Sequence, residues 1–276
     1  MTGLYLYCIR EKTDSGFFIK GIDGGDVLAL PYKDLEAVVS EVSLEDFGAE
    51  EIQKKAQEDL GWIKGKAQVH EQVIEKAMDY HFSPFPLGKS PLENKGLKAA
   101  IPMKFGTIFK TREKLRQVLK KHYFQFKENL KNLHKKQEWA VKIYLDRGIF
   151  QDWIKKSSSV VQDKEQEIAS LPEGTAYFMQ KQIDEAVSKE SDNALKEYID
   201  IFFEELKKYT HAGTRGKILA KELTEKLWPM VLNAIFLVSE EMLEDFVKKV
   251  NKLNKEYKSK GFRFEYSGPW PAYNFI

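Results

Sequence analysis

The sequence has one cysteine, no long hydrophobic run and almost no net charge, and each of these absences excludes a class of protein. Cys8 has no second cysteine with which to form an internal disulfide. The longest apolar stretch, residues 230–238, is interrupted by Asn233 and is far shorter than the ~18 residues of a membrane span. The 44 basic and 42 acidic residues leave a net charge of +2, so long-range attraction of nucleic acid to the whole chain is not expected.

The start of the chain lacks a basic region followed by an apolar one, and no Asn-X-Ser/Thr sequon is present. Together with the lone cysteine, these features predict a cytoplasmic protein with no membrane partner.

Motifs of enzymes and metal sites are also missing. The five histidines are scattered, and none begins the His-Glu-x-x-His pattern of a zinc site. No Gly-x-Ser-x-Gly elbow occurs, and the glycine-containing stretch 213–217 has neither the spacing nor the final hydroxyl of a phosphate-binding loop. Cys8 lies in a predicted core strand, where a thiol is protonated and inert. We therefore expect neither catalysis nor a cofactor nor a metal.

Hydrophobic residues make up 42% of the chain and aromatic residues 13%, which is enough to form a core. Alternating and helical periodicities predict short strands interleaved with long helices. Thr111 is expected to cap a helix, Gly261 to end one, and residues 191–193 to interrupt another. The expected strands span residues 4–9, 17–19, 35–42, 101–109, 138–146, 232–238 and 262–266, the helices 49–80, 111–133, 150–156, 175–209 and 240–257, and the loops 81–97 and 211–216.

This order of elements predicts the α+β class. Each half resembles a rearranged split βαβ unit, so we expect two ferredoxin-like-derived α/β domains with long helices packed on small antiparallel sheets. The N-terminal domain is expected to span residues 1–136, and the C-terminal domain residues 137–276, including an aromatic tail.

Two features on the helices have a structural and a functional interpretation. His70 lies on the apolar stripe of the first long helix, where a hydrogen-bonded core histidine is favoured over a ligand or a proton switch. Residues 110–136 contain ten basic and two acidic residues. A solvated helix face is the favoured interpretation of this segment, with binding of nucleic acid or of an acidic protein surface as alternatives.

The strongest local signal is the tail, residues 268–276. Pro269 and Pro271 disfavour both helix and strand pairing, so the tail should be extended or turning. Its aromatic side chains, Trp270, Tyr273 and Phe275, make sense only if they are buried. Folding back onto the chain's own domain is favoured over insertion into a partner, because a permanently exposed aromatic tail would promote aggregation.

Several of these segments, in this order, resemble the GvpL/GvpF family of gas vesicle proteins. The resemblance runs from end to end, and the tail is its most specific part; Ala272 stands where the family often has proline, and the proline-rich stretch 83–97 looks longer than usual. The segments that carry the resemblance are residues 4–7, 37–42, Trp62 with His70, 101–109, 138–144, 236–238 and 268–275.

The resemblance implies an accessory protein of gas vesicle assembly, without known enzymatic activity. It also implies as partners the hydrophobic shell protein GvpA and other accessory Gvp proteins, with no nucleic acid among them. We expect an apolar groove between a sheet and a long helix, near Phe105, Trp139 and Trp270, to shelter the shell protein. The competing hypotheses are a nucleic-acid binder that uses the basic helix, and an enzyme with a carboxylate pair such as Glu138 with Asp146 or Glu41 with Glu45.

Overall fold

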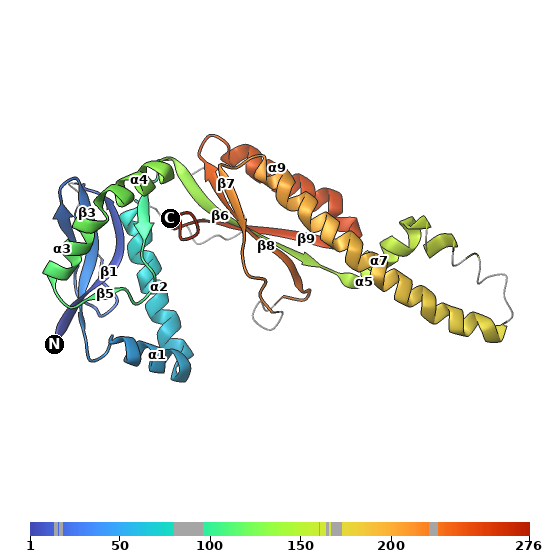
Figure 1. The fold of residues 1–276 in the computed structure, drawn as a ribbon, viewed down its shortest axis with the longest axis horizontal. Coiled ribbons are helices and arrows are strands. Elements are labelled where there is room, and N and C mark those ends of the chain that lie inside the picture. Colours follow the sequence, from blue (N-terminus) through green and yellow to red (C-terminus); the bar gives the residue numbers. More distant parts are fainter. Residues whose placement is uncertain are drawn as a thin grey trace. The chain divides into compact units, whose positions relative to one another are not determined.

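The computed structural model describes residues 1–13, 16, 19–79, 96–159, 161–163, 166, 173–220 and 226–276. The chain forms two compact units (Figure 1). Unit 1 consists of Met1–Glu138 together with Pro269–Ile276, and unit 2 of Trp139–Gly268. The tail, expected within the second domain, therefore groups with the first unit. Residues 17 and 18 of one expected strand, and most of the expected loop 81–97, lie outside the described residues.

The sheet of unit 1 is built around its first strand, β1 (Thr2–Glu11), which pairs with antiparallel neighbours on both sides. The strand order is β2-β3-β1-β4, with β2 at Val27–Tyr32, β3 at Leu35–Ser43 and β4 at Ala100–Pro102. Eight of the ten residues of β1 are buried, which explains why its sequence does not alternate.

Two predictions for this sheet were wrong. The strand β2 was not expected at all. The expected strand 101–109 is two short strands, β4 and β5 (Ile108–Phe109), because Gly106 turns the chain between them with a φ of 82°.

The helices of unit 1 are shorter than the periodicity predicted. The expected helix 49–80 is broken at Asp59, which ends α1 (Ala49–Glu58) and caps α2 (Leu60–Ala77) by accepting a hydrogen bond from the Trp62 amide. Thr111 caps α3 (Arg112–Lys121) as expected, and a second break at His122 separates α3 from α4 (Tyr123–Leu133).

These helices cover both faces of the sheet. Tyr5 and Tyr7 of β1 pack in one cluster with Val73 and Ile74 of α2. Leu4, whose side chain points to the opposite face, is buried as well, and α3 and α4 lie on that side (Figure 1). Both faces of the unit 1 sheet are therefore covered by helices.

Unit 2 has the strand order β7-β8-β6-β9, so its first strand, β6 (Lys136–Leu145), also lies inside the sheet. The strand β8 (Met230–Ser239) was expected, whereas β7 (Ala212–Arg215) lies where a loop was expected. The helices are α5 (Arg147–Ser157), α7 (Glu173–Lys207) and α9 (Leu243–Tyr257). The helix α7 runs without a break through residues 191–193, contrary to expectation, because a long apolar face packs it onto the core.

The last strand, β9 (Phe262–Trp270), begins at a glycine that no other residue can replace without strain. Gly261 ends the 3₁₀ turn η2 (Lys258–Lys260) with a φ of 93°, and a Cβ there would lie 2.6 Å from the Asp146 carbonyl oxygen. The strand continues through Pro269, although the prolines were expected to prevent pairing. An edge strand tolerates proline because one side of it makes no ladder hydrogen bonds, and β9 lies at the sheet's edge.

The two sheets, each with helices packed on it, confirm the α+β class with two sheet-and-helix domains.

Candidate tail-docking and partner-binding site

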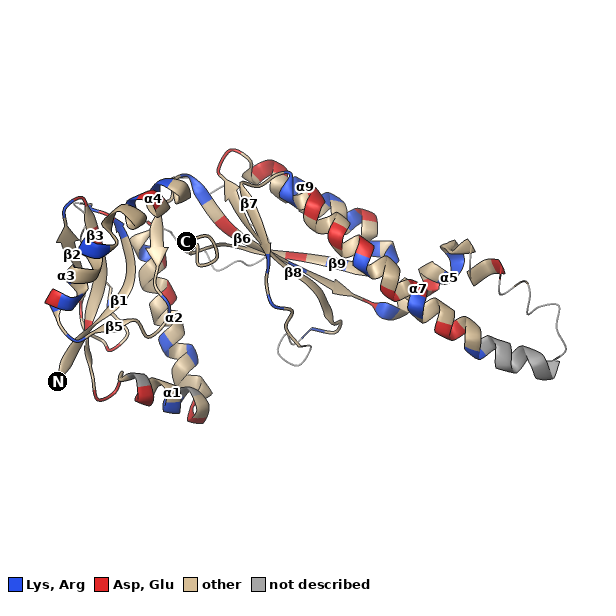
Figure 2. Cartoon of the chain, in the orientation of Figure 1, with Lys and Arg blue, Asp and Glu red and all other residues tan. Residues whose placement is uncertain are grey.

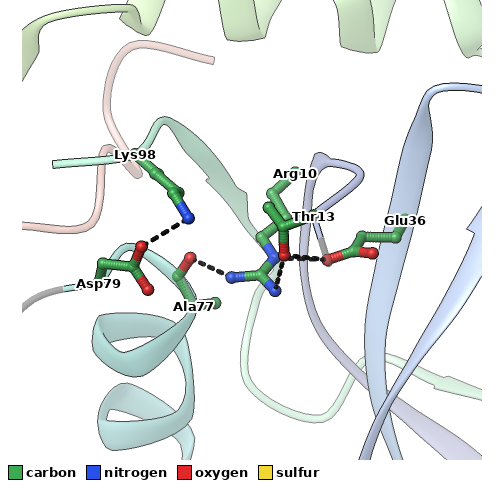
Figure 3. A network of polar contacts seen from close by, with 6 residues as sticks. All are labelled: Arg10, Thr13, Glu36, Ala77, Asp79 and Lys98. Carbon is green, nitrogen blue, oxygen red and sulfur yellow. Dashed lines mark hydrogen bonds and ion pairs between the residues drawn. The ribbon is translucent and has the colours of Figure 1, made fainter. Parts of the chain in front are cut away.

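The C-terminal end of α2 is held against the sheet by a buried arginine (Figure 3). Arg10 is 2% exposed, and its guanidinium donates to the Glu36 carboxylate at 2.8 Å and to the Ala77 carbonyl oxygen at 2.6 Å. The carbonyl groups of a last helical turn lack partners inside the helix and carry negative partial charge, so a cation there stabilises the helix end. Just beyond the helix, Lys98 forms an ion pair with Asp79. These contacts fix the helix that carries His70.

His70 is 1% exposed and is the centre of a hydrogen-bond chain. Its Nδ1 lies 3.0 Å from the hydroxyl of Tyr5, and its Nε2 lies 3.1 Å from both the Met103 carbonyl oxygen and the hydroxyl of Tyr273. A carbonyl oxygen can only accept, so Nε2 carries the proton and Nδ1 accepts from Tyr5. Burial lowers the pKa of His70 to about 4, which keeps the ring neutral. The expectation of a hydrogen-bonded core histidine is confirmed.

The chain of hydrogen bonds has one direction from end to end. The Gly106 amide donates to Tyr5, His70 donates onward to Tyr273, and the Tyr273 hydroxyl donates to a carboxylate oxygen of Glu71 at 2.8 Å. Hydrogen bonds aligned in this way polarise one another. The tail is therefore attached to α2 by a side chain that completes a buried network.

Asn274 makes the second attachment of the tail. Its backbone amide and its side-chain Nδ2 both donate to the Glu138 carboxylate, at 3.0 and 2.8 Å. Between this residue and the strand β9, Pro271 and Ala272 are buried. The sequence favoured docking of the tail onto its own chain over insertion into a partner. In the structure, Tyr273 and Asn274 do dock onto their own chain.

The two carboxyl groups that hold the tail, Glu71 and Glu138, and a third, Glu75, one turn further along α2, are partly or fully buried. Burial raises the pKa of Glu71, Glu75 and Glu138, and that of Glu75 reaches about 7 because the neighbouring Glu71 charge adds to the burial. The second carboxylate oxygen of Glu71 is buried and has no hydrogen-bond partner in the part of the chain that the structure describes. Burial of these carboxyl groups therefore costs less free energy when they are protonated.

Beside the docked tail lies a groove of about 610 Å³. One wall is formed by β4 and the residues that follow it, the second by α4, and the third by the end of the tail. The mixture of apolar side chains with few charges is typical of a site that takes an apolar segment. The groove is lined by Ile101, Pro102, Met103, Lys104, Gln125, Phe126, Asn129, Tyr273 and Ile276.

The structure distributes the five predicted site residues over different environments. Phe105 and Tyr273 both pack against the core of unit 1, where Phe105 makes an edge-on contact with His70 at 5.8 Å between ring centroids. Trp139 is completely buried in the core of unit 2 and has no surface to offer a partner. Trp270 is 42% exposed at the end of β9, and Phe275 is half-buried. Only Tyr273 lines the groove.

The attachment residues Glu71, Glu138 and Asn274 were not predicted. Asn274 had a visible signal, because it is a polar residue between two rings of a tail that had to dock. Glu138 was considered only as a partner of Asp146, and Glu71 only as the residue after His70. Their roles depend on the tail returning to unit 1, which no local pattern encodes.

Three of the four carboxylates proposed for an enzyme make other contacts in the structure. Asp146 caps α5 and accepts from the indole nitrogen of Trp228, while Glu138 holds the tail. Glu45 is exposed and pairs with the N-terminal amine. Within the described ranges, no group of three or more His, Cys, Asp or Glu side chains is arranged to hold a metal ion, and no helix has the length and apolar character needed to cross a membrane. Cys8 is buried, which raises its pKa to about 12, as expected of an inert thiol.

Comparison with known proteins identifies the family. The family model described as "Gas vesicle synthesis protein GvpL/GvpF" matches residues 3–88 and 97–276. The chain belongs to the GvpL/GvpF family. The residues between the two matched stretches, 89–96, lie within the proline-rich segment that looked longer than usual.

Relatives and solved structures agree with this assignment. Gas vesicle protein L of Streptomyces sp. (strain CB03234) is 25% identical over 98% of this chain and 91% of its own length. Gas vesicle protein F of Haloferax mediterranei is 22% identical over 99% and 92%. The crystal structure of GvpF from Anabaena sp. superimposes with a TM-score of 0.72 at 20% identity, covering 100% of this chain and 98% of that one. The GvpF structure from Microcystis aeruginosa gives 0.65 at 19% identity over 99% and 98%. A GvpL/GvpF protein thus acts in gas vesicle formation, and its family is described by vesicle synthesis rather than by a reaction.

Proposed function

We propose that this protein is a non-enzymatic assembly factor that works in the cytoplasm and binds the hydrophobic shell protein GvpA, with other accessory Gvp proteins as further partners. The observation that carries the proposal is the apolar groove between β4, α4 and the docked tail. Membership of the GvpL/GvpF family supports the biological setting.

The physical task explains why a groove is suitable. A shell subunit whose apolar surface finally faces gas would aggregate in water before it polymerises. A helper must therefore cover part of that surface and release it again. A groove of about 610 Å³ can take a few apolar side chains, which gives a contact that is specific without being permanent.

The tail forms one wall of this groove, so groove shape depends on tail docking. Ile276 and Tyr273 line the groove, and Tyr273 is held by Glu71 and His70. Loss of the tail should open the groove on that side. This refines the expectation that tail residues take part in partner binding.

The test is a pull-down of GvpA by this protein after co-expression, with three variants. Phe126→Gln places an amide in the groove, deletion of Ile276 shortens the tail wall, and deletion of residues 271–276 removes it. We expect each variant to capture GvpA about tenfold less well, or worse, which is equivalent to about 1.4 kcal/mol. Phe124→Gln is the matched control, because Phe124 lies on the same helix, is 84% exposed and is not among the groove residues.

Folding of each variant is checked by circular dichroism and thermal melting. Unchanged capture by folded protein without residues 271–276, together with unchanged capture by Phe126→Gln, would refute the groove as the binding site. Ile276 is 48% exposed, so its deletion tests the groove with little risk to the fold.

A further inference from the structure

The helices α3 and α4 carry more basic than acidic residues (Figure 2). Residues 110–136 contain ten basic and two acidic residues, a net charge of +8. Among the described residues, only Lys127 of these ten forms an ion pair with a carboxylate, through Glu11 and Asp34. Elsewhere among the described residues, some lysines are paired, as with Lys248 and Glu244 or Lys226 and Glu265.

A large exposed ring lies within this basic surface. Phe124, near the start of α4, is 84% exposed. Lys120 and Lys121 precede it by four and three residues, and Lys127 follows it by three. Glu128, four residues after Phe124 on the same helix, is the acidic exception. An exposed apolar side chain among mainly basic residues is the arrangement of an interface anchor with a polar rim.

The same unit carries the opposite arrangement around α1. Residues 41–59 contain seven acidic and two basic residues, a net charge of −5. Immediately after this stretch comes Leu60, which is 75% exposed. Glu58, two residues before Leu60, is exposed and has no ion pair among the described side chains. Unit 1 therefore has a basic surface with an exposed Phe and an acidic surface with an exposed Leu.

These two surfaces do not meet within one molecule. Among the described residues, no ion pair joins residues 41–60 to residues 110–136. In the ribbon, α1 lies at one end of unit 1 and α4 at the opposite end (Figure 1). Pairing of the two surfaces must therefore be intermolecular.

We propose that this protein associates head to tail with a second copy of itself, the basic α3–α4 surface around Phe124 of one molecule binding the acidic α1 surface around Leu60 of the next. Opposite charges steer the two molecules together and fix their orientation. The Phe–Leu contact adds apolar burial that salt does not screen. A heterologous contact of this kind leaves one surface free on each end molecule, so association extends beyond the dimer unless the geometry closes a ring.

The test measures molar mass by light scattering and sedimentation over a range of protein concentrations. We expect wild-type protein to form concentration-dependent oligomers at ~0.01 M salt, where charges act over about 30 Å, and to weaken strongly at ~1 M salt, where they act over about 3 Å. Lys120→Glu with Lys121→Glu, and separately Glu50→Lys with Glu58→Lys, should each weaken association by about tenfold or more.

The decisive arm mixes the two charge-reversed variants. Each alone brings like charges together, whereas the mixture pairs the reversed surfaces with each other and the unreversed surfaces with each other. We therefore expect association to return on mixing. Phe124→Gln and Leu60→Gln should each weaken association without changing its salt dependence. Lys252→Glu with Lys255→Glu, on exposed positions of α9 in unit 2, changes the net charge equally and should leave association unchanged.

Three outcomes overturn the proposal: wild-type protein that stays monomeric at low salt, charge-reversed variants that associate like wild type, or a mixture that fails to recover. A monomer that instead binds a single-stranded DNA oligonucleotide through Lys120 and Lys121 would show that the basic surface serves nucleic acid, and would also overturn it. The groove proposal is independent of this one, because Phe126→Gln tests capture of GvpA and Phe124→Gln tests self-association.

Discussion

The two units use the same kind of sheet but stabilise it differently. In each, the strand that comes first in the chain lies inside a sheet covered by helices. The core of unit 2 is almost wholly apolar and rich in aromatic contacts, such as the edge-on contact of Phe202 with Phe262 at 5.0 Å between ring centroids. The core of unit 1 includes Arg10, Glu36 and His70, all almost fully buried. Polar groups at such positions fix geometry more than they add stability, and unit 1 is where the tail docks.

The comparison predicts the largest loss of stability at the centre of unit 2. Trp139→Ala removes a ring that is completely buried in the aromatic cluster, and the cavity should cost about 3–5 kcal/mol of unfolding free energy. Urea unfolding followed by circular dichroism measures it. Phe105→Ala, at a half-buried ring of unit 1, is the matched change and should cost clearly less.

If Phe105→Ala were the more costly of the two, the packing of unit 2 would not be the stronger one, and the contrast between the units would be wrong.

A loss nearly as large is expected at the buried ion pair of unit 1, for a different reason. Arg10→Leu leaves the Glu36 carboxylate buried without its cation, and breaking such a pair costs about 3–5 kcal/mol. The double variant Arg10→Leu with Glu36→Leu should recover most of the loss, because no unpaired charge remains. Urea unfolding of both variants measures the difference, and a double variant no more stable than the single one would show that packing, not charge, is the main contribution.

Much of this architecture follows from sequence patterns. The strands β1, β3, β6 and β8 and the helix α9 have periodicities that tertiary packing reinforces, so they were predicted within a few residues. Boundaries failed where one side chain changes the backbone. Asp59 caps a second helix inside an unbroken apolar stripe, and Gly106 turns a run that reads as one strand.

The candidate site was less predictable because it depends on long-range topology. The contact between His70 and Tyr273 joins residues 203 positions apart. Aromatic composition pointed to the tail but could not tell a core ring from an anchoring one, so Trp139 and Tyr273 looked equivalent. Glu138 can be recognised as a hydrogen-bond partner of the tail only once it is known that the tail returns to unit 1.

The raised pKa of Glu75 should make unit 1, rather than unit 2, lose stability as the pH rises from acidic to neutral. The pKa of Glu75 is about 7 in the folded protein, above its ordinary value of 4.5. The unfolded chain therefore releases this proton more readily, and stability is lost as the pH rises from about 4.5 through 7. Glu75→Gln removes that loss, so its stabilising effect should be larger at pH 8 than at pH 5.

Unfolding of wild type and Glu75→Gln at each pH measures this effect. His70, whose lowered pKa removes stability as the pH falls from about 6.5 to 4, acts in both proteins and cancels in the difference. The matched control is Glu256→Gln, an exposed position of α9 in unit 2. Equal effects of Glu75→Gln at both pH values would contradict the raised pKa.

A smaller, local effect is expected at the tail itself. Asn274→Ala removes the side-chain Nδ2 donor to Glu138 and leaves the backbone amide donor in place, and we expect about 1–2 kcal/mol of lost docking free energy. Because docking is local, hydrogen exchange of residues 271–276 should speed up while global unfolding changes little. Asn274→Asp should be worse, since it places a second carboxylate against Glu138. Unchanged exchange in both variants would mean that the side chain of Asn274 does not help to hold the tail.

The smallest effect on stability is expected at Trp270, in contrast to Trp139. Trp270 is 42% exposed, so Trp270→Gln should change the unfolding free energy much less than Trp139→Ala, which empties a completely buried site. An indole that keeps 42% of its surface exposed, where the chain leaves β9 for the docked tail, can offer apolar area to a partner. We therefore expect Trp270→Gln to lower GvpA capture more than it lowers the melting temperature. Trp153→Gln, at a partly buried indole packed on the core of unit 2, should do the reverse. A Trp270→Gln protein that melts early and captures normally would place this ring with Trp139 among the structural residues, and partner binding would then rest on the groove alone.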